Sequence, residues 1–201
     1  MPFGISTPHR YGLLLGGSVL ALTAFATVPA GVGSAVQPHT VAFSENSPAR
    51  FWTPRGGLSS QAWTVLRRSA TARTALQLYK PFETGDTSVY DTLLTEDFVD
   101  APLAPGQGPG REGMKQHVAE DIVATFPDLT IRIEAIHVAG NTVTVRSVIS
   151  GTQQRPFLGV PATHRKVSFR AVDIHQVNPE RGIARTDHLE DLFGAYRQIT
   201  Q

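Results

Sequence analysis

The chain has 201 residues, with 18 basic and 17 acidic side chains and no cysteine. This length suits one domain with short extensions. The balanced charge, without a basic block, lacks the electrostatic footprint of a nucleic-acid-binding protein. The lack of cysteine excludes disulfides, a thiol nucleophile and thiolate metal sites. A small neutral or apolar molecule is the expected partner.

The N-terminus has the pattern of an export signal. Arg10 precedes an apolar run over residues 11–28, and small residues follow up to Ala35. The pattern predicts a secretory signal peptide over residues 1–35, cut after Ala35 or after Ala30, and a protein of the cell envelope or the extracellular space. An N-terminal membrane anchor is the alternative, but the apolar run is short and contains several glycines. No membrane association is expected after cleavage.

A linker is predicted over residues 36–58, which contain Pro, Gly and Ser without periodicity. The domain is expected to span residues 59–201. Its first helix is capped by Ser59 or Ser60 and should end or kink at Pro81. The apolar stripe of this helix consists of Trp63, Leu66, Ala70, Leu78 and Tyr79.

Two further helices are predicted before any strand. Gly85 stops the first helical region, and Asp86 caps a short helix through Tyr90, Leu93 and Leu94. The segment "DAPLAPGQGPGREG" is expected to be a loop. A third helix, ending at Pro127, has one face formed by Met114, His117, Val118, Ile122 and Phe126.

Beyond Pro127 the hydrophobic period changes to two. Four segments, "DLTIRIEAIHV", "GNTVTVRSVISG", "RKVSFRAVDIHQV" and "IARTDHLED", are predicted strands. A short helix from about Asp191 to Gln198 closes the chain. Three helices, an antiparallel sheet of about four strands and a closing helix predict an α+β domain. If the sheet is strongly curved, helices over one face would enclose a pocket.

The last two predicted strands bring together an acid and an imidazole. With a four-residue turn over residues 179–182, Asn178 faces Ile183, and Asp173 then lies directly opposite His188. A loop of three or five residues would send the two side chains to opposite faces. A carboxylate beside an imidazole in an apolar pocket can take and deliver protons. The alternative is a structural ion pair or a hydrogen-bonded core histidine.

The segment from Leu78 to Ile199 resembles the SnoaL-like polyketide cyclase family, also called ester cyclases, of the nuclear transport factor two-like superfamily. The resemblance rests on "YKPFETGD", "LLTEDFVD" and "GREGMKQHV...FPDL", followed by "GTQQRPFLGVPATHRKVSFRAVDIHQV" and "GIARTDHLEDLFGAYRQI". The most specific part is "PFLGVPATHRKV" followed by "DHLEDLFG". Three positions depart from the usual family pattern, namely Ala101, Gln153 and Asp187.

The resemblance implies a cone-shaped α+β barrel, usually oligomeric, with an apolar pocket. It also implies an intramolecular aldol condensation without metal or organic cofactor. The family's acid/base pair falls on Asp173 and His188, in the order opposite to that of the best-studied cyclases. Which of the two is the base stays open.

Other side chains are candidates for the pocket or for a metal. The aromatic residues and one arginine expected at the pocket are Tyr79, Phe98, Phe126, Arg146, Phe157 and Phe169. Arg146 has a competing solvent-facing interpretation, because Thr142 and Thr144 share its face. Asp173, His175 and His188 have the residue types of a metal site with open positions, but no metal is predicted.

The sequence therefore predicts an exported α+β domain that is expected to form a homo-oligomer. Its leading function is a cofactor-independent cyclase, isomerase or hydratase-type enzyme acting on a small carbonyl compound. The alternatives are a non-catalytic secreted binding module for an apolar ligand and a structural oligomerisation domain.

Overall fold

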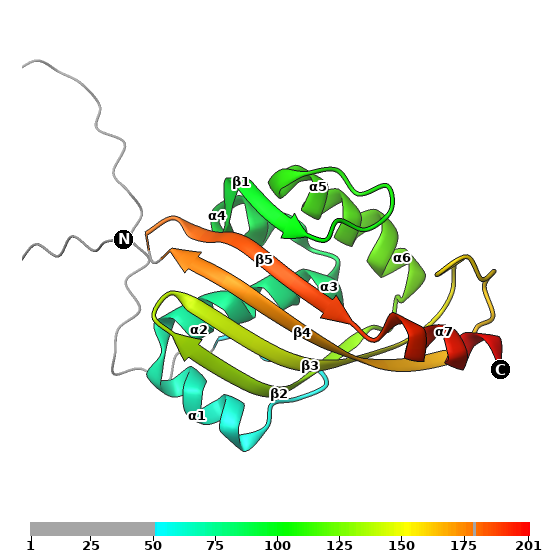
Figure 1. The fold of residues 1–201 in the computed structure, drawn as a ribbon, viewed down its shortest axis with the longest axis horizontal. Coiled ribbons are helices and arrows are strands. Elements are labelled where there is room, and N and C mark those ends of the chain that lie inside the picture. The colour runs from blue at the N-terminus through cyan, green and yellow to red at the C-terminus, as the bar shows by residue number, and fades with distance from the viewer. Residues whose placement is uncertain (1–50, 179) are drawn as a thin grey trace, which may run out of the picture. The chain divides into compact units, whose positions relative to one another are not determined.

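A computed structural model describes residues 51–178 and 180–201 (Figure 1). The predicted signal peptide and most of the predicted linker lie outside these residues. A five-stranded sheet has the order β1-β5-β4-β3-β2. Its strands are β1 (Leu94–Ala101), β2 (Thr130–Ala139), β3 (Thr142–Thr152), β4 (Lys166–Asn178) and β5 (Gly182–Glu190).

The predicted antiparallel meander is confirmed for β2 to β5. To the predicted sheet of about four strands, β1 adds a fifth strand, which pairs in parallel with β5. Its sequence "LTEDFVDA" contains three acidic residues, which are poor strand formers, and its buried positions do not alternate regularly. Long-range pairing with β5 therefore overrides a weak local preference.

The helical region that precedes the sheet is divided into short pieces. These are α1 (Ser60–Arg68), α2 (Ala70–Leu76), η1 (Gln77–Tyr79) and α3 (Lys80–Thr84). Ser59 caps α1 as predicted, accepting from the amide of Ala62 at 3.1 Å. The prediction of one continuous helix is wrong, because Ser69 ends α1 and caps α2 with its own hydroxyl. Pro81 lies in the first turn of α3, where its missing N–H costs no helical hydrogen bond.

Gly85 and Asp86 behave as predicted. Gly85 ends α3 with a left-handed φ of 75°, and Asp86 accepts from the amide of Ser88 at 3.0 Å. The helices η2 (Thr87–Val89) and α4 (Tyr90–Leu93) follow. The predicted third helix consists of α5 (Gly110–Gln116), the π-helical turn η3 (His117–Ile122) and α6 (Val123–Thr125).

Helices pack against one face of the sheet, and the core lies between them. Along β4 the odd-numbered positions from Val167 to Val177 are buried and the even-numbered ones are exposed. The core also takes Ala62 and Leu66 from α1, whereas Trp63 is 38% exposed. The closing helix α7 (Leu192–Thr200), capped by Asp191 as predicted, packs against the end of β4 (Figure 1).

The described part of the predicted linker is packed against the domain. Leu58 forms a parallel bridge with Ile133. Glu83, which is 8% exposed, accepts from the amides of Arg55 and Ile131. Residues 51–58 are therefore packed as part of the folded domain, and we call them the tether. Within the described residues, no helix is long and apolar enough to cross a bilayer.

Candidate active site

The predicted pairing of Asp173 with His188 is confirmed, but the turn that joins their two strands differs from the predicted one. Asn178 pairs with Gly182, which shortens the predicted turn by one residue. Ala184 is then an extra residue on β5, since Val177 faces Ile183 and Gln176 faces Arg185. This bulge restores the register, so Asp173 faces His188 from the neighbouring strand.

Gly182 makes this tight turn possible. Its φ is 94°, in the region that favours glycine, and a Cβ there would collide with the carbonyl oxygen of Leu93. The start of β5 can therefore pack directly on the α4 backbone. The position of His188 depends on this turn and on the bulge that follows it.

The Asp173 side chain is almost inaccessible to solvent. It is 8% exposed, and its Oδ2 accepts a hydrogen bond of 2.7 Å from the Tyr79 hydroxyl. Burial raises the pKa of Asp173 to about 7, although the Tyr79 hydrogen bond opposes that rise. Asp173 therefore changes its charge close to neutral pH.

His175 continues the hydrogen bonding from Asp173 into the core. The Tyr79 hydroxyl lies 2.9 Å from His175 Nε2, and His175 Nδ1 lies 2.9 Å from the Thr186 hydroxyl. His175 is fully buried, and this burial lowers its pKa to about 3. Its ring is therefore neutral, and both of its nitrogens have partners within the protein. A metal ligand needs a free ring nitrogen, which His175 does not offer here.

His188 has the opposite electrostatic environment. Its Nε2 is 3.3 Å from Asp100 Oδ1, and its Nδ1 is 2.8 Å from Glu190 Oε1. Asp100 and then Glu190 raise the pKa of His188 to about 10, so the ring is an imidazolium at neutral pH. The contact to Asp100 is an ion pair without hydrogen-bond geometry, and Nε2 is buried without a hydrogen bond among the described residues. Nε2–H therefore faces the Asp100 carboxylate in an ion pair and makes no hydrogen bond among the described residues.

One of the two carboxylate partners of His188, Asp100, comes from a sequence position far from the hairpin. Asp100 lies on β1 directly opposite Thr186, and Gln107 Nε2 donates to its Oδ2 at 2.8 Å. Glu190 shares a face with His188, two residues further along β5. The site therefore combines one cationic ring with three carboxyl groups, of which Asp173 titrates near neutrality.

The predicted pocket aromatics mostly lie in the core. Tyr79, Phe98, Phe126 and Phe169 are all buried, and Phe157 packs edge-on against Phe126 with ring centroids 5.1 Å apart. Of these side chains, Tyr79 contacts Asp173 directly. The other four belong to the surrounding core cluster or pack against it.

The expectation that Arg146 lines the pocket is corrected by the register. Arg146 faces Val172, whereas Asp173 faces the buried Val145, so Arg146 points to the opposite side of the sheet. There its Nε lies 3.4 Å from Glu134. The competing solvent-facing interpretation is therefore the correct one.

A family model, the SnoaL-like polyketide cyclase, matches residues 72–199 of the chain. The chain belongs to this family. No curated protein sequence matches the SnoaL-like chain.

Solved structures give the same fold. TsrD from Streptomyces laurentii is 27% identical with a TM-score of 0.56, over 63% of this chain and 94% of that one. A candidate polyketide cyclase from Bacillus cereus is 25% identical with a TM-score of 0.58, over 76% and 95% of the two chains. IdmH, a candidate polyketide cyclase from Streptomyces antibioticus, is 27% identical with a TM-score of 0.56, over 66% and 100%. The SnoaL-like chain therefore has the cone-shaped α+β fold of the nuclear transport factor two-like superfamily.

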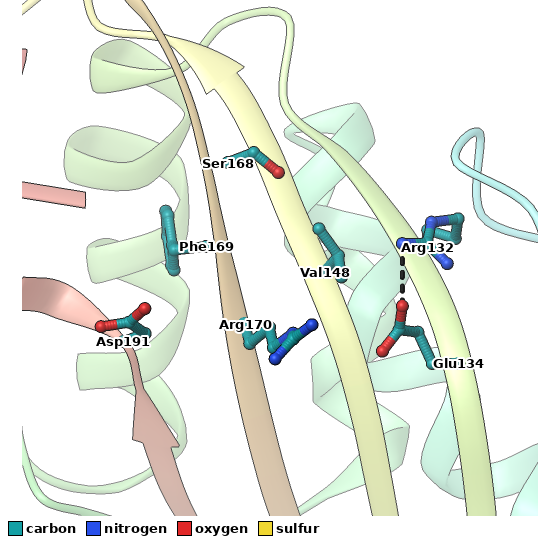
Figure 2. Close-up of a pocket in the computed structure, with 7 residues that line it drawn as sticks. All are labelled: Arg132, Glu134, Val148, Ser168, Phe169, Arg170 and Asp191. Carbon is teal, nitrogen blue, oxygen red and sulfur yellow. Dashed lines mark ion pairs between the residues drawn. The ribbon is translucent and has the colours of Figure 1, made fainter. Parts of the chain in front are cut away.

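The outer side of the SnoaL-like sheet carries a separate hollow of about 290 Å³ (Figure 2). Its lining includes Ser168 and Arg170, which occupy exposed positions on β4. An ion pair of 2.8 Å joins Arg132 to Glu134 beside it (Figure 2). Of the predicted site residues only Phe169 lines this hollow, and neither Asp173 nor His188 does.

Sequence reasoning missed Asp100, Glu190 and Thr186. Glu190 could have been found, because alternate residues of one strand share a face and His188 was already placed. Thr186 follows from the same rule. Asp100 had only a weak signal, the "DFVDA" motif of the family resemblance. Its strand was not predicted, so nothing placed it beside β5.

Proposed function

We propose that this SnoaL-like domain carries out cofactor-free acid/base chemistry on a small carbonyl compound. The reaction is an intramolecular aldol cyclisation or a related isomerisation or hydration. Asp173 and His188 are the acid/base pair. The observation that carries the proposal is their direct pairing across β4 and β5, where the buried Asp173 is partly ionised at neutral pH and the half-buried His188 is protonated.

The electrostatics assign a role to each member of the pair. A base must be free of its proton, and His188 keeps its proton until the pH approaches 10. Asp173, with a pKa of about 7, is partly ionised at neutral pH and close to the ideal value for a general base. Asp173 is therefore the base, and the imidazolium of His188 is the acid.

The proton balance of an aldol step fits these roles. Asp173 takes a proton from the carbon between two carbonyl groups of the substrate. That carbon forms a bond to another carbonyl carbon of the same molecule, and His188 gives a proton to the oxygen of that carbonyl. The proton that His188 gives is the one on Nε2, which has no hydrogen bond among the described residues and moves from its ion pair with Asp100 to the substrate oxygen. A proton returned from Asp173 to His188 through water restores the starting state.

Exchange of substrate protons tests the proposal without knowledge of the natural substrate. Wild type is incubated in D₂O with a panel of β-keto esters, and exchange at the carbon between the carbonyls is followed by NMR. Asp173→Asn should lower catalysed exchange by about 10²-fold or more, as expected for loss of a general base. Asp187→Asn is the matched control and should leave the exchange rate unchanged. Asp187 immediately precedes His188 but is ion-paired with Arg185 outside the site.

Equal exchange rates for wild type and Asp173→Asn would contradict the proposal. The pH dependence gives an independent check. Exchange should rise with pH through about 7, as Asp173 ionises, and aldol turnover should fall as the pH approaches 10, when His188 loses its proton.

A non-catalytic binding module is the second candidate. It is favoured by the partners that the protein itself supplies, since Tyr79 occupies Oδ2 of Asp173 and both ring nitrogens of His175 have partners. Such a module would bind a neutral apolar molecule with an affinity that changes little between pH 6 and 8, whereas turnover would follow Asp173. Export of either form remains a prediction from residues 1–35.

A further inference from the structure

A chain of hydrogen bonds leads away from Asp173 through groups to which the reaction assigns no role. It connects Asp173 Oδ2 to the Tyr79 hydroxyl at 2.7 Å, this hydroxyl to His175 Nε2 at 2.9 Å, and His175 Nδ1 to the Thr186 hydroxyl at 2.9 Å. All four residues are buried, with exposed fractions between 0% and 8%. Their elements are η1 for Tyr79, β4 for Asp173 and His175, and β5 for Thr186.

We propose that His175 and Thr186 are positioning residues, which act through Tyr79 to fix the Asp173 carboxyl and to reserve its Oδ1 for the substrate. This inference rests on the proposed function for its catalytic meaning. The hydrogen-bond arrangement itself can be tested without any substrate.

The number of protons sets the direction of each bond. Burial and the neighbouring Asp173 raise the pKa of Tyr79 well above its ordinary value, so Tyr79 keeps its single proton. An ionised Asp173 can only accept, so the Tyr79 O–H donates to Oδ2. The phenol oxygen is then free to accept from His175, which must carry its proton on Nε2. Nδ1 in turn accepts from the Thr186 hydroxyl.

This arrangement uses each proton once and makes the two oxygens of Asp173 unequal. Oδ2 is held by Tyr79, and Oδ1 has no hydrogen bond among the described residues. A proton taken from a substrate can bind Oδ1 while every other proton stays in place. Binding at Oδ2 would require Tyr79 to turn towards His175 and the imidazole to move its proton to Nδ1. We call the hydrogen-bonded chain from Asp173 through Tyr79 and His175 to Thr186 the relay. The relay favours Oδ1 of Asp173 as the basic atom.

A satisfied core histidine is the simpler explanation of the same contacts. A purely structural His175 would affect stability, but it would not couple Thr186 to the titration of Asp173. The relay predicts that coupling, because a phenol whose oxygen accepts a hydrogen bond is a stronger donor to the carboxylate. The other groups acting on Asp173 are Glu190, His188 and Asp100, and a change at Thr186 leaves these three in place.

The experiment compares Thr186→Val, which is nearly isosteric but has no hydroxyl, with Thr186→Ser, which keeps the hydroxyl and loses a methyl group. Wild type and both variants are labelled with ¹³C in the aspartate carboxyl groups and ¹⁵N in the histidine rings, and both nuclei are followed by NMR from pH 5 to pH 9. Tyr79→Phe, which removes the hydrogen bond to Asp173, marks the largest change expected and should raise the pKa of Asp173 by about 1.

Three results are expected. His175 stays neutral with its proton on Nε2 in wild type, Thr186→Val raises the pKa of Asp173 in the direction of Tyr79→Phe, and Thr186→Ser restores the wild-type value. A proton on Nδ1 of His175, or an Asp173 titration that is the same in Thr186→Val and wild type, would overturn the relay. If the relay holds but Asp173→Asn exchanges β-keto ester protons as fast as wild type, the proposed function fails and the relay stands.

Discussion

Replacing Asp173 with asparagine should stabilise the protein in neutral and alkaline solution, and the gain should vanish in acid. Asparagine has nearly the same shape, and its Oδ1 can still accept the Tyr79 hydrogen bond that Asp173 Oδ2 accepts at 2.7 Å. What the variant loses is the charge. The difference between the two proteins therefore isolates the cost of ionising a carboxyl group in the interior.

The size of the effect follows from the pKa. Burial raises the pKa of Asp173 from 3.8 to about 7. A difference of roughly three pKa units corresponds to about 4 kcal/mol of unfolding free energy. The folded state holds the proton more tightly than the unfolded chain, so the contribution is complete below about pH 4 and is lost as the pH rises through about 7. Relative to wild type, Asp173→Asn should gain about 4 kcal/mol between about pH 4 and pH 8.

Urea unfolding, followed by circular dichroism at a series of pH values, measures this difference. Asp187→Asn is the control, because Arg185 lowers the pKa of the partly exposed Asp187. Removing the Asp187 charge should therefore not produce a gain in stability that grows with pH. Stability curves for wild type and Asp173→Asn that run parallel across this range would refute the assignment. They would mean that Asp173 ionises in the folded protein as easily as in the unfolded chain.

Three further changes test the neighbourhood of the site and the parts of the chain that frame it. Glu190→Gln should lower the pKa of His188, since one of the two carboxylates that raise it is gone. An NMR titration of the imidazole protons measures this pKa, and an unchanged midpoint would contradict the expectation. Glu83→Gln should destabilise the fold by about 2 kcal/mol and expose residues 51–58 to proteases, because the carboxylate binds two backbone amides. A variant as resistant to limited proteolysis as wild type would exclude that tether. Gln153→Ala should cost about 3 kcal/mol in thermal or urea unfolding, because its fully buried amide bonds three backbone carbonyls and accepts from Thr163. A loss below about 1 kcal/mol would show that the loop over residues 153–165 keeps its conformation without the Gln153 amide.

The hairpin shows how far the sequence leads. Alternation predicted β4 and β5, and the parity of a four-residue turn placed Asp173 opposite His188. The actual turn is shorter, and by parity alone it would have separated the two side chains. The bulge at Ala184 compensates for that difference. The packing of Gly182 against Leu93 is a long-range contact that local sequence patterns do not reveal.

Missed elements have similar physical causes. Ser69 interrupts a stretch whose apolar spacing is helical throughout, since a serine hydroxyl competes for the next amide and caps a second helix. Strand β1 has little intrinsic preference for extended structure and forms because β5 offers an edge. Without β1, the sequence could not bring Asp100 to His188, and the charge of the imidazole could not be predicted.

The departure at Gln153 has a structural explanation. The family resemblance implies a histidine at this position. Here the two N–H groups of the Gln153 amide are shared among the carbonyls of Arg155, Val160 and Pro161, and its oxygen accepts from the Thr163 hydroxyl at 2.6 Å. An amide offers two donors and an acceptor on one planar group, whereas a neutral imidazole offers one of each. Gln153 therefore organises the loop before β4.

The account depends on two pKa values in one site. Asp173 must lose its proton near neutral pH, and His188 must keep its proton well above it. A single NMR titration of the wild-type protein, with ¹³C in the aspartate carboxyls and ¹⁵N in the histidine rings, reports both groups at once. We expect Asp173 to titrate at a pH of about 7 while His188 stays protonated up to about pH 10. An Asp173 signal that titrates near its ordinary value of 3.8, or a His188 ring that is neutral at pH 7, would contradict the account.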